Sequence, residues 1–167
     1  MQDIEIAGIN ACYDVSLRIE PSDLKYSGEL HLAFLNDTEN AIDELVFRLY
    51  PNTTYNYAGS LAAVRADIQG QEAAFITTLP DQSVLHLPFP GLLLPGDAIE
   101  IAISFTGQIP ENSTTYGIYN FDPDVMTIAL ANSFPILASH IRNGWGMEEI
   151  QPFGDAVTSD TSLFHVT

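Results

Sequence analysis

Histidine spacing would most directly reveal a catalytic metal site in this chain. The four histidines are His31, His86, His140 and His165. None is followed by glutamate and then by a second histidine four residues on, so these 167 residues do not contain the helical H-E-x-x-H zinc-protease site. His31 and His86 fall within alternating strand patterns, which favours positions on a sheet face. His140 and His165 lie in a less regular C-terminal segment, where nothing in their spacing favours a site.

Carboxylates and hydroxyls give no stronger indication of catalysis. Asp122 and Asp124 flank Pro123 and are the type of ligand that calcium prefers, but their spacing is typical of a turn. Glu148 and Glu149 are adjacent, so their side chains diverge on any regular backbone and make a poor acid–base pair. No serine stands in a G-x-S-x-G elbow, and no G-x-x-x-x-G-K phosphate loop is present. We therefore expect no catalytic residue and no metal ligand in this chain.

The charge of the chain argues against two classes of partner. Five Lys and Arg face 22 Asp and Glu, which gives a formal net charge of −17. A surface that acidic repels phosphate backbones and anionic lipid, so we expect no nucleic-acid partner and no membrane contact by this domain. The single cysteine, Cys12, excludes an intrachain disulfide and is interpreted as a small apolar residue at the entry to a strand.

The elements that must position any site are short strands, and the clearest lies within the stretch 92–110. A turn at 95–97 opens this stretch, and Gly107 and Pro110 are expected to end the strand. Between them, apolar residues alternate with polar or small ones, which is the pattern of a strand with one face in a core. The apolar positions are Ile99, Ile101, Ile103 and Phe105.

The same alternation recurs along the chain and predicts strands near 12–20, 28–36, 44–50, 63–68, 72–77, 83–88, 98–106, 115–121 and 125–131. The segment 63–77 is expected to be a hairpin turning at 69–70, and Pro88, Pro90 and Gly91 are expected to end the strand before them. The predicted core around the strand 98–106 comprises Leu17, Ile19, Leu32, Phe34, Phe47 and Leu49. This spacing of strands, with no helical stripe, predicts an all-β fold: a saddle-like antiparallel β-sandwich of about nine or ten short strands.

The length of 167 residues suits one domain, and we expect a leader at 1–11 followed by a single β-sandwich domain over 12–167. The chain begins with Met1 before a polar pair and stops within an apparent strand at 162–167. We therefore expect it to be the excised N-terminal domain of a longer protein.

Three segments carry a resemblance to a known family. They are YDVSLRIEP at 13–21, GELHLAFLNDTENAIDELVFRLYPN at 28–52 and LLLPGDAIEIAISFTGQIP at 92–110. Shorter steps follow in the same order at 117–119 (GIY), 133–137 (SFPIL) and 154–155 (GD), the last before SLFHVT. In order and spacing these pieces resemble the N-terminal domain of the alanyl aminopeptidase (gluzincin) family of zinc metallopeptidases.

The resemblance implies a non-catalytic β domain. It would pack on a thermolysin-like zinc domain later in the same polypeptide and help shape the cleft for a peptide substrate. The zinc ligands and the general-base glutamate would belong to that following domain, so no cofactor is expected in this chain. Some relatives carry a degenerate active site. The resemblance therefore indicates the family of the whole protein more strongly than it indicates an activity.

Two sets of residues follow from the resemblance. In many members a Gln or Glu late in this domain helps hold the free amino terminus of the substrate. Residues 125–134 contain neither, which leaves Asn132 as the candidate substrate-binding residue. The expected interface with the zinc domain is the apolar C-terminal segment: Phe134, Pro135, Ile136, Leu137, Trp145 and Phe153.

A second hypothesis is a free-standing β-sandwich that binds carbohydrate or protein through Tyr50, Tyr55 and Tyr57. The same tyrosines suit an interdomain contact or the corners of a sandwich. An H-E-x-x-H motif in the polypeptide beyond Thr167 would decide for the peptidase.

Three N-glycosylation patterns begin at 36, 52 and 112. The compartment stays open, with an extracellular or cell-surface location favoured.

Overall fold

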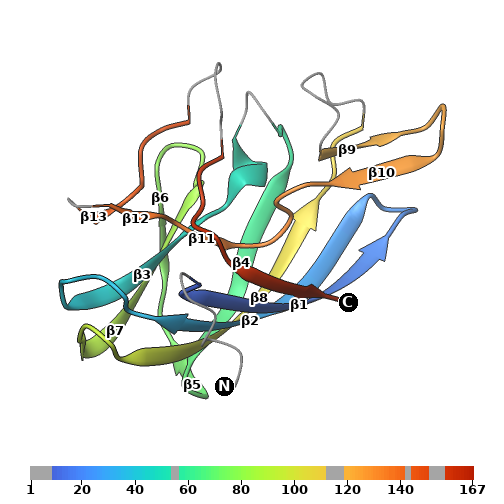
Figure 1. Cartoon of the computed structure of the whole chain (residues 1–167). Coiled ribbons are helices and arrows are strands. Elements are labelled where there is room, and N and C mark those ends of the chain that lie inside the picture. Colours follow the sequence, from blue (N-terminus) through green and yellow to red (C-terminus); the bar gives the residue numbers. More distant parts are fainter. Residues whose placement is uncertain (1–8, 54–56, 112–118, 142–143, 151–156) are drawn as a thin grey trace.

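The chain forms an all-β sandwich in the computed structural model, which describes residues 9–53, 57–111, 119–141, 144–150 and 157–167. One sheet has six strands in the order β14–β1–β2–β8–β4–β5 and a second has four in the order β11–β3–β7–β6 (Figure 1). The six-stranded sheet comprises β14 (Leu163–Val166), β1 (Ala11–Glu20), β2 (Lys25–Leu35), β8 (Ala98–Gln108), β4 (Ser60–Ile68) and β5 (Gln71–Ala73). The four-stranded sheet comprises β11 (Ile136–Leu137), β3 (Ile42–Arg48), β7 (Val84–Leu93) and β6 (Ile76–Thr78).

Three further elements complete the described fold. The pair β9 (Tyr119–Asp122) and β10 (Thr127–Leu130) forms one two-stranded sheet, and β12 (His140–Ile141) and β13 (Gly144–Trp145) form another. A single 3-10 turn, η1 (Tyr50–Asn52), follows β3. The prediction of an all-β sandwich is confirmed, and the described strands outnumber the predicted ones because several contain only two residues.

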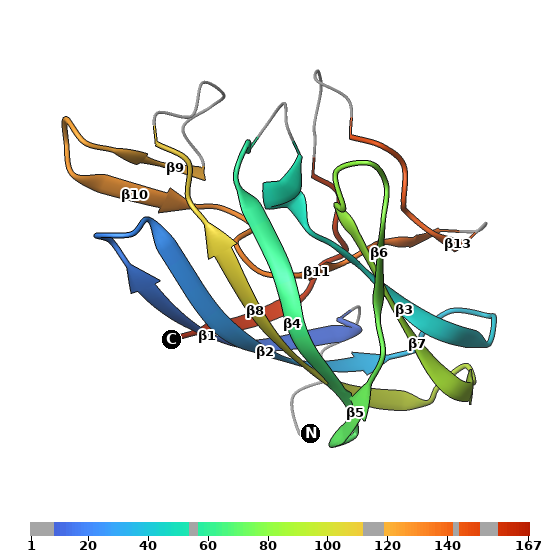
Figure 2. The same cartoon turned by 180° about the vertical axis from the view of Figure 1, so that it is seen from behind.

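Strand β8 lies at the centre of the six-stranded sheet, between β2 and β4. Its four predicted core residues are buried, with exposed fractions of 5%, 2%, 0% and 1% for Ile99, Ile101, Ile103 and Phe105. The view from behind shows β1, β2, β8 and β4 side by side (Figure 2). The alternation in the sequence therefore identified the central strand and the face that it turns to the core.

Most of the other predicted core residues are also buried. Leu32, Phe34, Phe47 and Leu49 are at most 2% exposed, and Leu17 is half-buried against the same core. The prediction was wrong for Ile19, which is 41% exposed. The pairing of β14 with β1 ends at Val15, so the described part of β14 does not extend along β1 as far as Ile19.

The strand ends differ from the prediction in two places. Pro88, Pro90 and Gly91 do not end β7, which continues to Leu93. The pairing with β3 becomes irregular there, because Pro88 lies opposite Glu44 and the next pair joins Leu93 to Ile42. An irregularity of this kind is one of the few places where a sheet accepts proline. Gly107 likewise lies within β8 instead of ending it.

The predicted hairpin over 63–77 is half right. The turn at Gln69 and Gly70 is present, with positive φ at both residues (50° and 77°). The returning segment is divided, however, because β5 pairs with β4 in one sheet whereas β6 pairs with β7 in the other. The predicted strand at 115–121 is described only from Tyr119 onward.

The C-terminal strand β14 runs parallel to β1 at the edge of the six-stranded sheet (Figure 1). The ring of Phe164 stacks on that of Tyr13, with centroids 4.5 Å apart. Phe164 and Val166 nevertheless remain 44% and 52% exposed. Tyr13 and Val15, their partners in β1, are buried core residues. The apolar face of the sheet therefore continues onto β14 without complete cover.

Replacing Gly107 by alanine should lower the free energy of unfolding by about 2–3 kcal/mol. A Cβ at this position would overlap the ring of Tyr26. That ring has little freedom to move, because it is 2% exposed and its hydroxyl accepts a hydrogen bond from Tyr119 at 2.8 Å. Gly146→Ala is the control, since its Cβ would come no closer than 3.4 Å to a neighbour. Equal urea midpoints for the two variants would contradict the tight packing of Tyr26.

Candidate functional site

The predicted substrate-binding residue, Asn132, lies after β10 and adopts a positive φ of 53°. Its side chain is half-buried, and its Nδ2 donates a hydrogen bond to the hydroxyl of Tyr57. Burial raises the pKa of Tyr57, outweighing the opposite effect of this hydrogen bond, so the phenol stays protonated at neutral pH. Among the described residues, Asn132 Oδ1 has no hydrogen-bond partner. Asn132 therefore presents an amide that Tyr57 orients and whose oxygen accepts no hydrogen bond from another described residue.

The tyrosines proposed for carbohydrate binding occupy the interior of the sandwich. Tyr50 and Tyr57 are 2% and 0% exposed, and their ring centroids lie 6.3 Å apart. Tyr50 Oη hydrogen-bonds both the backbone N–H and the carbonyl of Thr158. Tyr55 lies outside the described residues. Two buried rings cannot stack on a sugar in solvent, so at Tyr50 and Tyr57 the observation favours sandwich corners.

The six predicted interface residues lie where the C-terminal segment returns to the sandwich. Pro135, Ile136 and Leu137 are buried within the chain itself, and β11 pairs with β3. Phe134 and Trp145 are half-buried: Phe134 lies beside the rings of Tyr13 and Phe164, and Trp145 beside those of Phe34 and His140. Phe153 lies outside the described residues. The role of these residues at an interface stays a prediction.

Arg48, which sequence reasoning missed, is buried on the outer face of the four-stranded sheet. It is only 5% exposed. Its Nη1 donates to the carbonyls of Gly146 and Glu148, at 3.1 and 3.0 Å, and its guanidinium carbon lies 5.6 Å from the centre of the Tyr50 ring. Burial lowers the pKa of Arg48, despite opposing contributions from Tyr50, Asp81 and Glu148. Arg48 thus joins β3 to the segment after β13.

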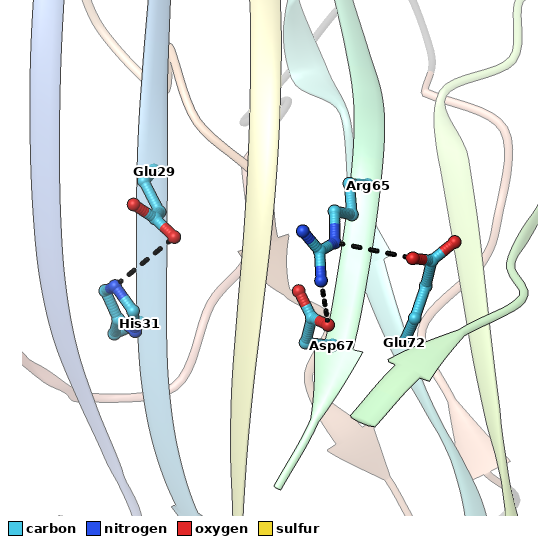
Figure 3. Close-up of polar contacts among 5 residues, drawn as sticks. All are labelled: Glu29, His31, Arg65, Asp67 and Glu72. Carbon is cyan, nitrogen blue, oxygen red and sulfur yellow. Dashed lines mark hydrogen bonds and ion pairs between the residues drawn. The ribbon is translucent and has the colours of Figure 1, made fainter. Parts of the chain in front are cut away.

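The outer face of the six-stranded sheet carries a row of ionisable side chains (Figure 3). His31 lies 3.6 Å from Glu29 on β2, and Arg65 on β4 pairs with Asp67 at 2.8 Å and with Glu72 of β5 at 3.7 Å. A shallow hollow of about 740 Å³ lies over this face, with small residues of β2 and β8 (Ala33 and Ala102) among those that line it. Arg65 thus links carboxylates of two neighbouring strands, β4 and β5.

The other candidate side chains serve structural purposes. His86 lies between Glu44 and Thr78, at 3.1 and 3.0 Å, as expected for a residue on a sheet face. Asp122 accepts the backbone N–H of Asp124 at 3.0 Å, which is the turn that the sequence favoured. Within the described ranges, no three His, Cys, Asp or Glu side chains form a group that could hold a metal ion.

Two of the three glycosylation asparagines are tied into the fold. Asn36 is 0% exposed, and its Nδ2 donates to the carbonyls of Asn40 and Leu93. Asn52 uses its amide to bind the backbone of Leu61 and Gln82. The third, Asn112, lies outside the described residues. Asn36 and Asn52 therefore have structural roles in this fold.

In the part of the chain that the structure describes, no helix is long and apolar enough to cross a bilayer.

Comparison with known proteins finds solved structures that are similar to this fold. No protein-family model matches the chain, and no curated protein matches it. A two-domain M1 zinc metallopeptidase, solved as a mutant bound to L-arginine, matches 95% of this chain and 32% of its own, with a TM-score of 0.53 and 18% identity. The M1 zinc metallopeptidase from Deinococcus radiodurans matches 64% of this chain and 22% of its own (TM-score 0.46, 18% identity). Native yeast LTA4 hydrolase matches 64% and 15% (TM-score 0.45, 20% identity).

The match over 95% of the chain shows that this sandwich shares its fold with part of a two-domain M1 zinc metallopeptidase. The resemblance found in the sequence is thus confirmed at the level of the fold. The chain spans only 15% to 32% of the length of these three solved proteins.

Proposed function

We propose that this chain is a non-catalytic β domain of an aminopeptidase-like zinc metallopeptidase. It would pack on a thermolysin-like zinc domain of the same polypeptide and help shape the cleft for a peptide substrate. The observation that carries the proposal is the shared fold over 95% of this chain with 32% of a two-domain M1 zinc metallopeptidase. In this account the zinc ion and the general base belong to the following domain, and residues 12–167 form one unit beside it.

Asn132 would be the contribution of this domain to substrate binding. A free amino terminus is a protonated ammonium that only donates hydrogen bonds, so it needs an acceptor. What supports Asn132 in this role is that its Nδ2 is engaged by Tyr57, whereas its Oδ1 is free among the described residues. Tyr57 is fully buried, so it would fix the orientation of the amide.

The contact with the zinc domain would form along the C-terminal segment and the neighbouring edge of the six-stranded sheet. Phe134 and Trp145 are the partly exposed members of the predicted interface. Phe164, Val166 and Ile19 are between 41% and 52% exposed on or beside this edge. Apolar side chains exposed close together are typical of a surface that another domain covers.

Hydrolysis of aminoacyl amides tests the proposal. The 167-residue chain should show no activity above background, because in this proposal the zinc ligands and the general base belong to the following domain. The longer polypeptide should hydrolyse the same amides, and Asn132→Ala within it should raise KM for substrates with a free amino terminus. Substrates with an acetylated amino terminus provide the control. Activity of the 167-residue chain alone, or equal effects of Asn132→Ala on both substrates, would contradict the assignment.

A further inference from the structure

A cavity of about 350 Å³ lies between the start of β1, the end of β2 and the C-terminal segment. It is separate from the hollow over the six-stranded sheet and from Asn132. Its size is at the lower end for small-molecule sites, which suits a single side chain or a small molecule. The lining residues that matter here are Phe34, Asp37, Thr38, His140, Trp145 and Asp160.

One wall of this cavity is aromatic. Trp145 is half-buried, with its ring 6.3 Å from that of the buried Phe34. His140 meets Trp145 edge-on at 4.9 Å, which holds the indole on a second side. An indole fixed in this way at the wall of a cavity provides a surface on which an aliphatic stem or a cation can pack.

The remaining described walls carry two carboxylates, those of Asp37 and Asp160. Asp37 accepts a hydrogen bond from Asn10 at 3.0 Å, and both of these residues line the cavity. The carboxylate of Asp160 makes no hydrogen bond or ion pair within the described part of the chain. Among the described residues that line the cavity there is no lysine or arginine. Two exposed carboxylates therefore line it, and neither forms an ion pair with another described residue.

We propose that this cavity binds a guanidinium or alkylammonium group on an aliphatic stem. The carboxylates of Asp37 and Asp160 would receive its N–H donors, and the indole of Trp145 would cover the stem or the charged head. Two sources carry this chemistry: a free arginine-like or lysine-like molecule, and an arginine or lysine side chain of another polypeptide segment. The inference concerns this chain alone and does not depend on the proposed peptidase function.

Trp145 is the only tryptophan in the chain, so its fluorescence reports on this cavity directly. Titration with Nα-acetyl-arginine amide should change the emission in a saturable way. Nα-acetyl-citrulline amide has nearly the same shape without the charge, and it should bind at least about tenfold more weakly because it lacks a charge-assisted bond. A pentapeptide with one central arginine separates the two sources. Tighter binding of the pentapeptide assigns the site to a polypeptide, and tighter binding of the acetylated amide assigns it to a small molecule.

Asp160→Asn tests the charged wall. Asp160 is exposed and makes no side-chain hydrogen bond, so the variant should fold normally. It should weaken binding of the arginine amide about tenfold, the loss expected for one charge-assisted contact. Asp124→Asn removes the same charge at the distant β9–β10 turn and should change the affinity less than about twofold. Absence of saturable binding, equal binding of the citrulline analogue, or equal effects of the two variants would each overturn the proposal.

Discussion

Raising the pH from 9 to 11 should lower the free energy of unfolding by about 4 kcal/mol. Three tyrosines carry this effect, and burial raises the pKa of each far above the ordinary value of 10.0: Tyr13, Tyr26 and Tyr119. In the unfolded chain these phenols lose their protons near pH 10, whereas in the fold they keep them. The stability that they contribute is therefore complete below pH 10 and is lost as the pH rises above it.

The magnitude follows from the number of protons. At pH 11, one pH unit above the unfolded pKa, each retained proton costs about 1.4 kcal/mol, and three such groups give the expected total. Urea unfolding at a series of pH values measures it. Tyr13→Phe should remove about a third of the pH dependence. A free energy of unfolding that stays constant between pH 9 and 11 would contradict the burial of these hydroxyls.

Phe105→Ala should lower the free energy of unfolding by about 3–5 kcal/mol. Phe105 lies on β8 at the middle of the six-stranded sheet and is 1% exposed. Its ring passes over Gly28, the residue opposite it on β2, and meets the edge of Tyr26 at 6.4 Å. Since Gly28 has no side chain with which to fill the space, truncation leaves a cavity that neighbouring groups cannot close.

The control for this variant is Glu100→Ala on the exposed face of the same strand. That change should alter the free energy of unfolding by no more than about 0.5 kcal/mol. Denaturant melts of both variants under one condition decide the comparison. Equal losses would mean that the inward and outward faces of β8 are exchanged.

The local pattern of the sequence was sufficient to predict a strand and its buried face wherever the strand is long and has one solvent-exposed face. The alternation of Ile99 to Phe105 identified β8 and its buried side, because period two is a property of the strand itself. Ile19 continues the same alternation in β1, yet it is exposed, because its cover depends on how far β14 extends along β1. Burial at a sheet edge is thus set by a distant segment and not by the local period.

The candidate sites were harder to predict than the strands, because each is formed by segments that are far apart in the sequence. Arg48 looks like an outward-facing residue of β3, yet it is buried, and the carbonyls that bind its guanidinium come from the distant segment 144–150. The cavity beside Trp145 joins Asp37 to Asp160, which are far apart in the sequence, so no local motif could indicate it. Tyr57 and Asn132 likewise meet across 75 positions. The sequence did identify Asn132 and Trp145 as residues of interest, but it could not name their partners.

Zinc stoichiometry tests most directly the claim that the chemistry lies outside this chain. The 167-residue chain and the longer polypeptide would each be equilibrated with zinc, passed through a desalting column and measured by inductively coupled plasma mass spectrometry. The account predicts about one tightly held zinc ion per longer polypeptide and none per 167-residue chain, because residues of the following domain would supply the ligands. One zinc ion held by the 167-residue chain, or none held by the longer polypeptide, would contradict it.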